Sequence, residues 1–199
     1  MAVPQPIELM STEQYLAWEN ALGDGRHEFV DGEVFAMTGT SINHNEATLN
    51  LIVALRHALA DTPCRVFGMD IKVRVNAANA VFYPDIVVTC SEADFSRQGP
   101  GIVEAPKVIV EVASPSTSDY DLMGKFARYR LSPTLMEYVL VSADHHDLIV
   151  HRKLADGQWV VAETTTPNTL ELRSIEVNIP FADIFANVAY VAPPPERER

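Results

Sequence analysis

The sequence reads VFYPDIVV at residues 81–88 and APKVIVEVA at residues 105–113, two short apolar runs that each contain one acidic residue. Such runs, bounded by turn residues, are typical of strands that are buried on both faces of a sheet. An ionised carboxylate is costly to bury there unless a cation or several hydrogen-bond donors meet it. The two runs therefore predict that Asp85 and Glu111 have such partners inside the fold.

A predicted helix follows the second run, after the turn SPSTS at residues 114–118, and it carries Lys125, Arg128 and Tyr129. A hard divalent cation prefers oxygen ligands from one or two carboxylates, together with carbonyl oxygens and water. Two strands with one acid each, followed by a helix with a lysine, therefore predict a divalent-metal site. The structural alternative is that Asp85 follows a proline at a turn and that Glu111 caps the loop after its strand.

The ordered motifs Pro84-Asp85, EVASPS at residues 111–116, Lys125 and Tyr129 resemble those of restriction endonucleases in the PD-(D/E)XK nuclease superfamily. More narrowly, they are similar to a bacterial branch that was long filed as a domain of unknown function. The resemblance extends upstream to HEFVDGE at residues 27–33, which is similar to the opening hairpin of that branch, and it covers residues 11–185.

The chain departs from the superfamily at Ala113, where the usual lysine would stand two residues after the glutamate. In the bacterial branch a lysine on the following helix takes that place, and Lys125 matches this pattern. Without the resemblance, the alternative for Lys125 is a surface ion pair with Asp121, which typically contributes only about 0.3–0.5 kcal/mol.

The resemblance implies a metal-dependent endonuclease that hydrolyses DNA phosphodiester bonds and works as a homodimer. Asp85 and Glu111 would hold Mg²⁺ or Mn²⁺, and Lys125 would assist the attacking water. Glu28 would be a further ligand or would orient the site. Judged without the resemblance, a glutamate in a hairpin such as Glu28 is expected to be exposed to solvent.

Three further residues, Tyr129, His44 and Glu46, are candidates for substrate contacts. Tyr129 lies one turn beyond Lys125 and is expected either to bind a phosphate or to pack half-buried. His44 is near the start of a predicted helix, where a phosphate contact competes with capping or packing. Glu46 matches the acid that some of these nucleases carry on their first core helix, although the helix dipole favours a carboxylate there in any case. The basic side chains expected to face a phosphate backbone are Lys72, Arg74, Lys125, Arg128 and Arg130.

The 199 residues carry a formal net charge of −12, from 15 Lys and Arg against 27 Asp and Glu. This balance argues against a protein that coats phosphate backbones regardless of sequence, but a local basic patch can coexist with it. Cys64 and Cys90 have no zinc-site spacing and fit a reducing cytoplasm better than a disulfide scaffold. The first residues lack signal-peptide features, and no apolar run approaches the roughly 20 residues of a membrane helix. A cytoplasmic protein without membrane contact is expected.

Length and composition predict one endonuclease-like domain at residues 11–188, with an arm at residues 1–10 and a flexible proline-rich, charged tail at residues 189–199. The fold class is α/β or α+β, with a restriction-endonuclease-like mixed sheet flanked by helices. Ser11 and Gln14 predict a capping box, and Asp31-Gly32 predicts an N-terminal hairpin. An antiparallel C-terminal meander is expected over residues 137–161, and a short closing helix over residues 179–185.

Two functions from other classes remain open. A nucleic-acid-binding or interaction module would keep the nuclease fold without turnover, and Ala113 in the usual lysine position favours this alternative because fold does not guarantee activity. An acid–base hydrolase that uses the same two carboxylates without metal would stay active in a chelator. It would also hold one carboxyl group with a strongly raised pKa.

Overall fold

The computed structural model describes residues 9–22, 26–37, 39–95, 101–113, 119–162 and 166–192, and of residues 119–122 it describes the backbone alone. Most of the N-terminal arm, the turn at residues 114–118 and the tail from residue 193 lie outside the described residues. The α-helices are α1 (Thr12–Ala21), α2 (Ile42–Ala58), α3 (Asp119–Tyr129) and α4 (Phe181–Ile184). The strands are β1 (His27–Val30), β2 (Glu33–Ala36), β3 (Arg65–Gly68), β4 (Lys72–Val75), β5 (Ala80–Phe82), β6 (Ile86–Thr89), β7 (Ile102–Val103), β8 (Pro106–Ala113), β9 (Glu137–Ser142), β10 (Asp147–Lys153), β11 (Trp159–Val161), β12 (Thr169–Leu172) and β13 (Val177–Pro180).

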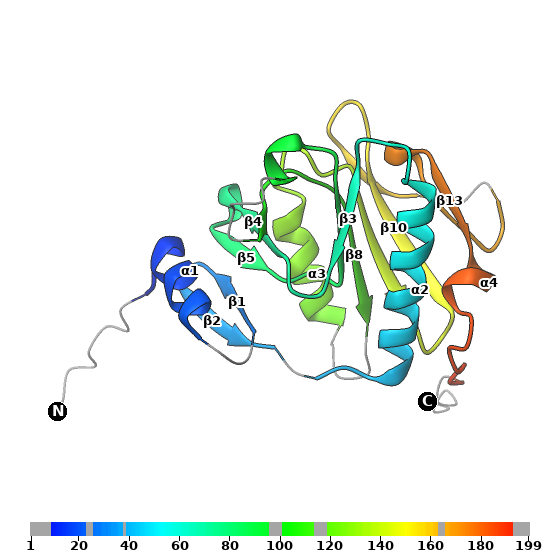
Figure 1. Ribbon diagram of the computed structural model, residues 1–199, viewed down its shortest axis with the longest axis horizontal. Coiled ribbons are helices and arrows are strands. Elements are labelled where there is room, and N and C mark those ends of the chain that lie inside the picture. The colour runs from blue at the N-terminus through cyan, green and yellow to red at the C-terminus, as the bar shows by residue number, and fades with distance from the viewer. Residues whose placement is uncertain are drawn as a thin grey trace, which may run out of the picture.

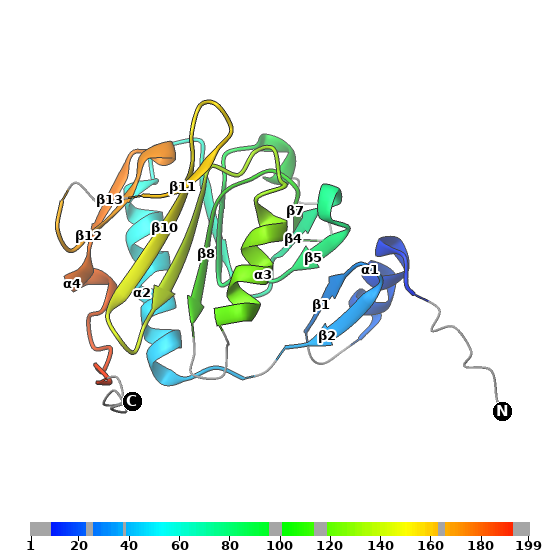
Figure 2. The ribbon, with the colours of Figure 1, turned by 180° about the vertical axis from the view of Figure 1, so that it is seen from behind.

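The central layer is a six-stranded sheet in the order β11-β10-β9-β8-β6-β3. Strands β8 and β9 are parallel and are joined through α3, whereas the other neighbouring strands are antiparallel. Helices α2 and α3 lie on opposite faces of this sheet (Figures 1 and 2). The expected fold class, a mixed sheet flanked by helices, is confirmed.

Strand β8 divides its side chains between the two faces. Val108, Val110 and Val112 belong to the core that packs under α2, whereas Ile109 belongs to the core that includes Phe126 of α3. Because side chains alternate along a strand, Glu111 continues the row of Ile109 and faces α3. The apolar run is thus buried on both faces, as the sequence predicted, and its one acid points to the helix that carries Lys125.

A second sheet, in the order β2-β1-β5-β4-β7, packs against the α3 side of the first through the core that contains Phe82 and Tyr129. The prediction of one strand over residues 81–88 is wrong, because β5 belongs to this sheet and β6 to the six-stranded sheet. Pro84 has no backbone N–H for a strand ladder, and residues 83–85 carry the chain from one sheet to the other. This break places Asp85 where the two sheets meet.

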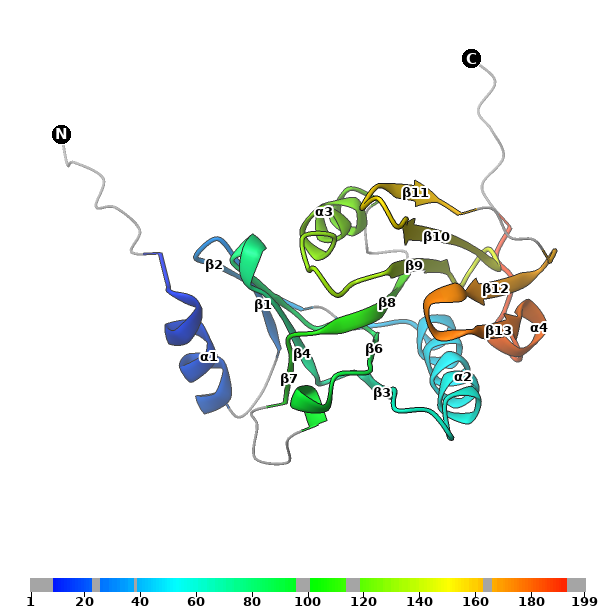
Figure 3. The ribbon, with the colours of Figure 1, turned by 90° about the horizontal axis from the view of Figure 1, so that it is seen from above.

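The N-terminal hairpin is confirmed, with β1 and β2 antiparallel around Asp31 and Gly32. Both turn residues have positive φ angles, 51° and 97°, as a type I′ turn requires. The capping box at Ser11 and Gln14 is also confirmed, and α1 packs Tyr15 on Phe29 of β1 with ring centroids 5.0 Å apart. Seen from above, α1 and this hairpin lie at the end of the molecule opposite α4 (Figure 3).

The antiparallel meander β9-β10-β11 is confirmed. The expected closing helix begins later than predicted, because Ile179 pairs with Leu170 in the two-stranded sheet β12-β13 and only residues from Phe181 onward are helical. Ile179 is buried in the core under α2, and this burial holds the segment before Pro180 in a strand.

Cys64 and Cys90 form a disulfide with an Sγ–Sγ distance of 1.98 Å. In the antiparallel pair of β3 and β6, Arg65 lies opposite Thr89. Cys64 precedes Arg65 and Cys90 follows Thr89, so the same register places the two cysteines opposite each other. The expectation that these two cysteines do not form a disulfide is corrected by this pairing. In the part of the chain that the structure describes, no helix is long and apolar enough to cross a membrane.

Candidate nuclease site

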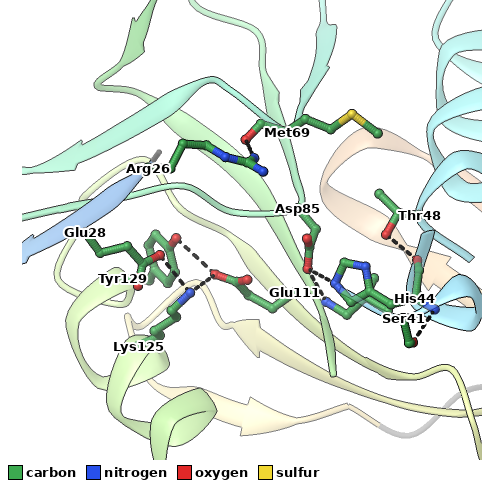
Figure 4. Close-up of polar contacts among 11 residues, drawn as sticks. Arg26, Glu28, Ser41, His44, Thr48, Met69, Asp85, Glu111, Lys125 and Tyr129 are labelled. Atoms are coloured by element: carbon green, nitrogen blue, oxygen red, sulfur yellow. Dashed lines mark hydrogen bonds and ion pairs between the residues drawn. The ribbon is translucent and has the colours of Figure 1, made fainter. Parts of the chain in front are cut away.

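The predicted metal-binding acids come together at the edge where β6 begins and β8 ends. Ile86 pairs with Val110 in the antiparallel ladder of β6 and β8. Continuing this register by one residue sets Asp85 beside Glu111, because antiparallel partners keep constant register. The two carboxylates, which are 26 positions apart in the sequence, therefore lie at one place in the fold (Figure 4).

Helix α3 supplies a cation and a hydroxyl group to Glu111. Lys125 Nζ lies 3.5 Å from Glu111 Oε1, and the Tyr129 hydroxyl donates a hydrogen bond of 3.1 Å to the same oxygen. Lys125 and Tyr129 are one turn apart on the helix, so both side chains reach the same strand. Only 5% of the Glu111 side chain is exposed, which explains why this carboxylate needs both partners. The side chain of Asp121, the alternative partner for Lys125, lies outside the described residues.

Glu28 joins the site from β1 of the second sheet. Its Oε1 lies 2.8 Å from Lys125 Nζ and accepts a hydrogen bond of 3.3 Å from the backbone N–H of Tyr83. The neighbouring His27 bonds in the other direction to Glu19 of α1, and the Tyr83 hydroxyl also donates to Glu19 at 2.8 Å. Glu28 is therefore not the exposed hairpin residue that its position in the sequence suggests, because α1 and Tyr83 fix its strand beside Lys125.

Asp85 is held through one of its two oxygens. Oδ2 accepts a hydrogen bond of 2.7 Å from the backbone N–H of Val112 and lies 3.1 Å from His44 Nε2. His44 is in the first turn of α2, where its own backbone N–H donates to the Ser41 side chain that caps the helix. Among the described residues, no hydrogen bond is made by Oδ1 of Asp85, and the side chain is 22% exposed. Within the described part of the chain, the carboxylate is thus fixed on one side and open on the other.

The electrostatic balance at the site is negative, because the carboxylates of Glu28, Asp85 and Glu111 surround one ammonium group. Burial raises the pKa of Glu111 to about 8, the charges of Asp85 and Glu28 act in the same direction, and Lys125 and the Tyr129 hydroxyl oppose them. Burial alone would lower the pKa of Lys125, but the charges of Glu111 and Glu28 raise it above its usual value. Lys125 is therefore a cation at neutral pH and cannot accept a proton.

This donor set fits a hard divalent cation. Carboxylate oxygens are the ligands that Mg²⁺ and Mn²⁺ prefer. A divalent cation would counteract the burial and the negative charges of Asp85 and Glu28 that raise the pKa of Glu111. Among the described residues, no three His, Cys, Asp or Glu side chains gather closely enough to hold a metal ion without further ligands. An ion here would be bound by Asp85 and Glu111 together with water or substrate oxygens. Mg²⁺ is usually bound in proteins through one or two carboxylates in this way.

The remaining candidates lie in different surroundings. Glu46 is half-buried in α2, and in the described part of the chain it makes no hydrogen bond or ion pair with the site. The expected basic surface is wrong for Lys72, which is buried and donates to Asn20 of α1. Arg74 forms an ion pair of 2.8 Å with Glu13, so this second basic side chain is also bound by a residue of α1.

Arg26 was not singled out from the sequence. Its Nη1 donates to the Met69 carbonyl at 3.0 Å and pairs with Asp70 at 3.2 Å, and the Met69 N–H in turn donates to the Asp85 carbonyl. The Arg26 side chain is 45% exposed and lies on the Asp85 side of the site (Figure 4). The only sequence signal was its position two residues before Glu28.

His151 packs against α3, and its burial leads to a pH prediction. His151 of β10 stacks on Phe126, the residue after Lys125, with ring centroids 4.2 Å apart, and burial lowers the pKa of His151. The unfolded chain therefore takes up a proton near pH 6.5 that the folded protein resists. We expect stability to be lost as the pH falls from about 6.5 toward the lower folded pKa.

Thermal unfolding at a series of pH values would test this prediction, with His151→Phe as the comparison because it keeps a stacked ring. The loss of stability between about pH 7 and pH 5 should be smaller in His151→Phe than in the unaltered protein. Parallel curves for the two proteins would contradict the role given to His151.

The fold and the acid–lysine constellation define a restriction-endonuclease-like protein. A crystal structure described as a putative nuclease belonging to DUF820 from Anabaena variabilis shares the fold, with a TM-score of 0.71 at 15% sequence identity. The match covers 89% of this chain and 98% of that chain.

Sequence comparison makes the family explicit. Residues 12–182 match the family model Uma2, described as "Putative restriction endonuclease". The uncharacterized protein slr1290 of Synechocystis sp. is 32% identical over 185 residues, which is 93% of this chain and 96% of that protein. The uncharacterized protein sll1609 of the same organism is 30% identical over 168 residues, or 84% and 94% of the two chains. The chain belongs to the Uma2 family, and the resemblance seen in its motifs is confirmed.

Proposed function

We propose that the protein is a Mg²⁺- or Mn²⁺-dependent endonuclease that hydrolyses DNA phosphodiester bonds. The observation that supports this proposal is the convergence of Glu28, Asp85, Glu111 and Lys125, from two sheets and a helix, on one partly open site. Asp85 and Glu111 would hold the ion. Such an ion supplies activation of the attacking water and neutralisation of charge on the phosphate.

The side chains of the chain have separate tasks in this proposal. Lys125 stays protonated, so it orients water and offsets negative charge as a cation, and it does not act as a base. Glu28 holds Lys125 at 2.8 Å and so positions it. The Tyr129 hydroxyl is used by Glu111, and we therefore assign Tyr129 to orienting this carboxylate in place of the phosphate contact. In this proposal Lys125 would also take the place of the lysine that the superfamily usually has at the position of Ala113.

Two observations favour other functions. Ala113 favours an inactive nuclease-fold module that binds nucleic acid or a partner. The raised pKa of Glu111 is what a metal-free acid–base hydrolase would need. Each alternative gives a different result in a single cleavage experiment.

The experiment measures nicking of supercoiled plasmid and degradation of single-stranded DNA with Mg²⁺, with Mn²⁺ and with chelator, and it uses Glu111→Gln as the control variant. We expect cleavage that needs both the ion and Glu111. Cleavage that survives chelation would favour the metal-free hydrolase. Absence of cleavage under all three conditions would favour the inactive module. The homodimer stays a prediction from the family resemblance, and a monomeric mass by light scattering would contradict it.

Arg26 is expected to bind a backbone phosphate next to the scissile one. Its partly exposed side chain bonds to Met69, whose backbone N–H in turn donates to the Asp85 carbonyl, and arginine suits phosphate geometry. Arg26→Ala should weaken binding to DNA of any sequence and lower the slope of log K against log salt by about 1. Binding of a fluorescent duplex over a salt series, without divalent ions, would measure this. Arg56→Ala, an exposed arginine of α2, is the matched control, and equal effects of the two changes would reject the phosphate contact.

A further inference from the structure

We propose that His44 is a positioning residue for Asp85: it fixes Oδ2 of the carboxylate so that Oδ1 faces the divalent ion. This inference rests on the proposed ion site of Asp85 and Glu111. The inference goes beyond that site because it assigns a role to α2, a helix that carries neither acid. In this role α2 orients the Asp85 carboxylate for ion binding.

His44 and a backbone N–H both hydrogen-bond to one oxygen of Asp85. An ionised carboxylate can only accept hydrogen bonds, so the contact of 3.1 Å requires that the His44 Nε2 atom carries a hydrogen. Together with the Val112 N–H at 2.7 Å, two donors from separate elements occupy Oδ2. Donors on one oxygen set the rotation of the whole carboxylate group, and this fixes the direction of the other oxygen.

Within the described part of the chain, the His44 imidazole has no hydrogen-bond partner other than Asp85. His44 Nδ1 is buried and makes no hydrogen bond within the described part of the chain, and the His44 side chain is only 13% exposed. With Nε2 used by Asp85 and Nδ1 enclosed, the ring offers no N–H to a DNA phosphate. Among the described residues, the contact with Asp85 is then the one polar interaction that can account for a histidine at this place.

The segment of α2 that carries His44 is held in place by hydrogen bonds and by the core. Ser41 caps the helix by accepting from the His44 N–H at 3.2 Å, and Thr48 donates to the His44 carbonyl at 2.7 Å. One turn of α2 is thus held on both sides of the residue. Farther along, Leu51 and Leu55 anchor the helix in the core against the six-stranded sheet. A group that orients a metal ligand needs such support, because small displacements weaken the ligand geometry.

The test uses three substitutions of His44 and one control. Glutamine can place an amide N–H near the position of Nε2, whereas asparagine is one bond too short and leucine has no donor. His57→Leu changes an exposed histidine on the last turn of the same helix. Calorimetry measures Mn²⁺ binding to chelator-treated protein, thermal unfolding reports on the fold, and plasmid nicking gives kcat and KM.

We expect His44→Leu and His44→Asn to weaken Mn²⁺ binding by about 10- to 100-fold, the range found for residues that orient metal ligands. His44→Gln should restore binding to within a few fold, and His57→Leu should bind like the unaltered protein. The cleavage defect should appear in kcat at subsaturating Mn²⁺ and recover when Mn²⁺ is raised. If the leucine variant does not fold, the difference in Mn²⁺ binding between His44→Gln and His44→Asn tests the positioning role in the same way.

The outcomes separate this inference from the proposed nuclease. Unchanged Mn²⁺ binding in the asparagine and leucine variants would overturn the positioning role while leaving the nuclease intact. Ion binding that depends on His44, in a protein that cleaves no DNA, would support the positioning role and count against the nuclease. Absence of Mn²⁺ binding in the unaltered protein would overturn both.

Discussion

Replacing Lys125 by methionine is expected to lower cleavage by about 10²- to 10³-fold, the usual effect of removing one group that stabilises developing charge. The same change should lower the free energy of unfolding by about 3 kcal/mol, because removing one partner of a buried ion pair leaves uncompensated charge behind. Two carboxylates lose their cation at once, since Lys125 Nζ lies 2.8 Å from Glu28 and 3.5 Å from Glu111. Methionine keeps the apolar stem, so the effect belongs to the ammonium group.

Arg128 offers a matched control on the same helix. It pairs with Asp31 at 2.7 Å, but both side chains are largely accessible, with 35% and 57% exposed. Surface pairs of this kind contribute about 0–1 kcal/mol, so Arg128→Met should change stability little and cleavage less than Lys125→Met does. Urea unfolding and plasmid nicking measure the two effects separately.

A double variant distinguishes the structural task of Lys125 from the catalytic one. Lys125→Met combined with Glu111→Gln removes charges of both signs and should recover part of the lost stability, because leaving a buried group unpaired costs more than removing both partners. Cleavage should stay lost in the double variant. Full activity in a Lys125→Met protein that binds Mn²⁺ normally would refute the assignment of Lys125 to the attacking water.

The acids could be predicted from the sequence because their signal is local. Each interrupts an apolar run, and burial of a lone carboxylate demands a partner wherever the strand ends up. Lys125 and Tyr129 are likewise linked by helix geometry, which places residues four apart on one face. Local rules therefore predicted Asp85, Glu111 and α3 before any tertiary contact was known.

The partners that come from distant elements could not be predicted in this way. His44 and Asp85 are 41 residues apart, and the Tyr83 N–H meets Glu28 across 55 residues. Their contacts depend on how α2 and the second sheet dock, which no periodicity encodes. The break between β5 and β6 could not be predicted either. Residues 81–88 are buried throughout except at Asp85, and such a pattern looks the same for one strand as for two strands that belong to different sheets.

Asp85→Asn is expected to lower cleavage by about 10³-fold or more, since an amide replaces a charged ligand of the proposed ion and active-site groups that act as a unit are lost together. The stability of the variant should be equal to that of the unaltered protein or higher. Asparagine has nearly the same shape, and its oxygen can still accept the hydrogen bond from Val112. Removing the charge also relieves the repulsion from Asp85 that helps to raise the pKa of Glu111. Such an exchange of stability against function is typical of active sites.

Mn²⁺ calorimetry, thermal unfolding and plasmid nicking on Asp85→Asn together decide whether the acid pair is functional or structural. Asp147→Asn, at an exposed position at the start of β10, controls for the loss of one negative charge from the chain. If Asp85 served only to cap the turn after Pro84, its replacement would cost stability and leave ion binding unchanged. A functional acid predicts the reverse pattern, with ion binding and cleavage lost in a protein that unfolds no earlier, because two neighbouring carboxylates repel each other until a cation lies between them.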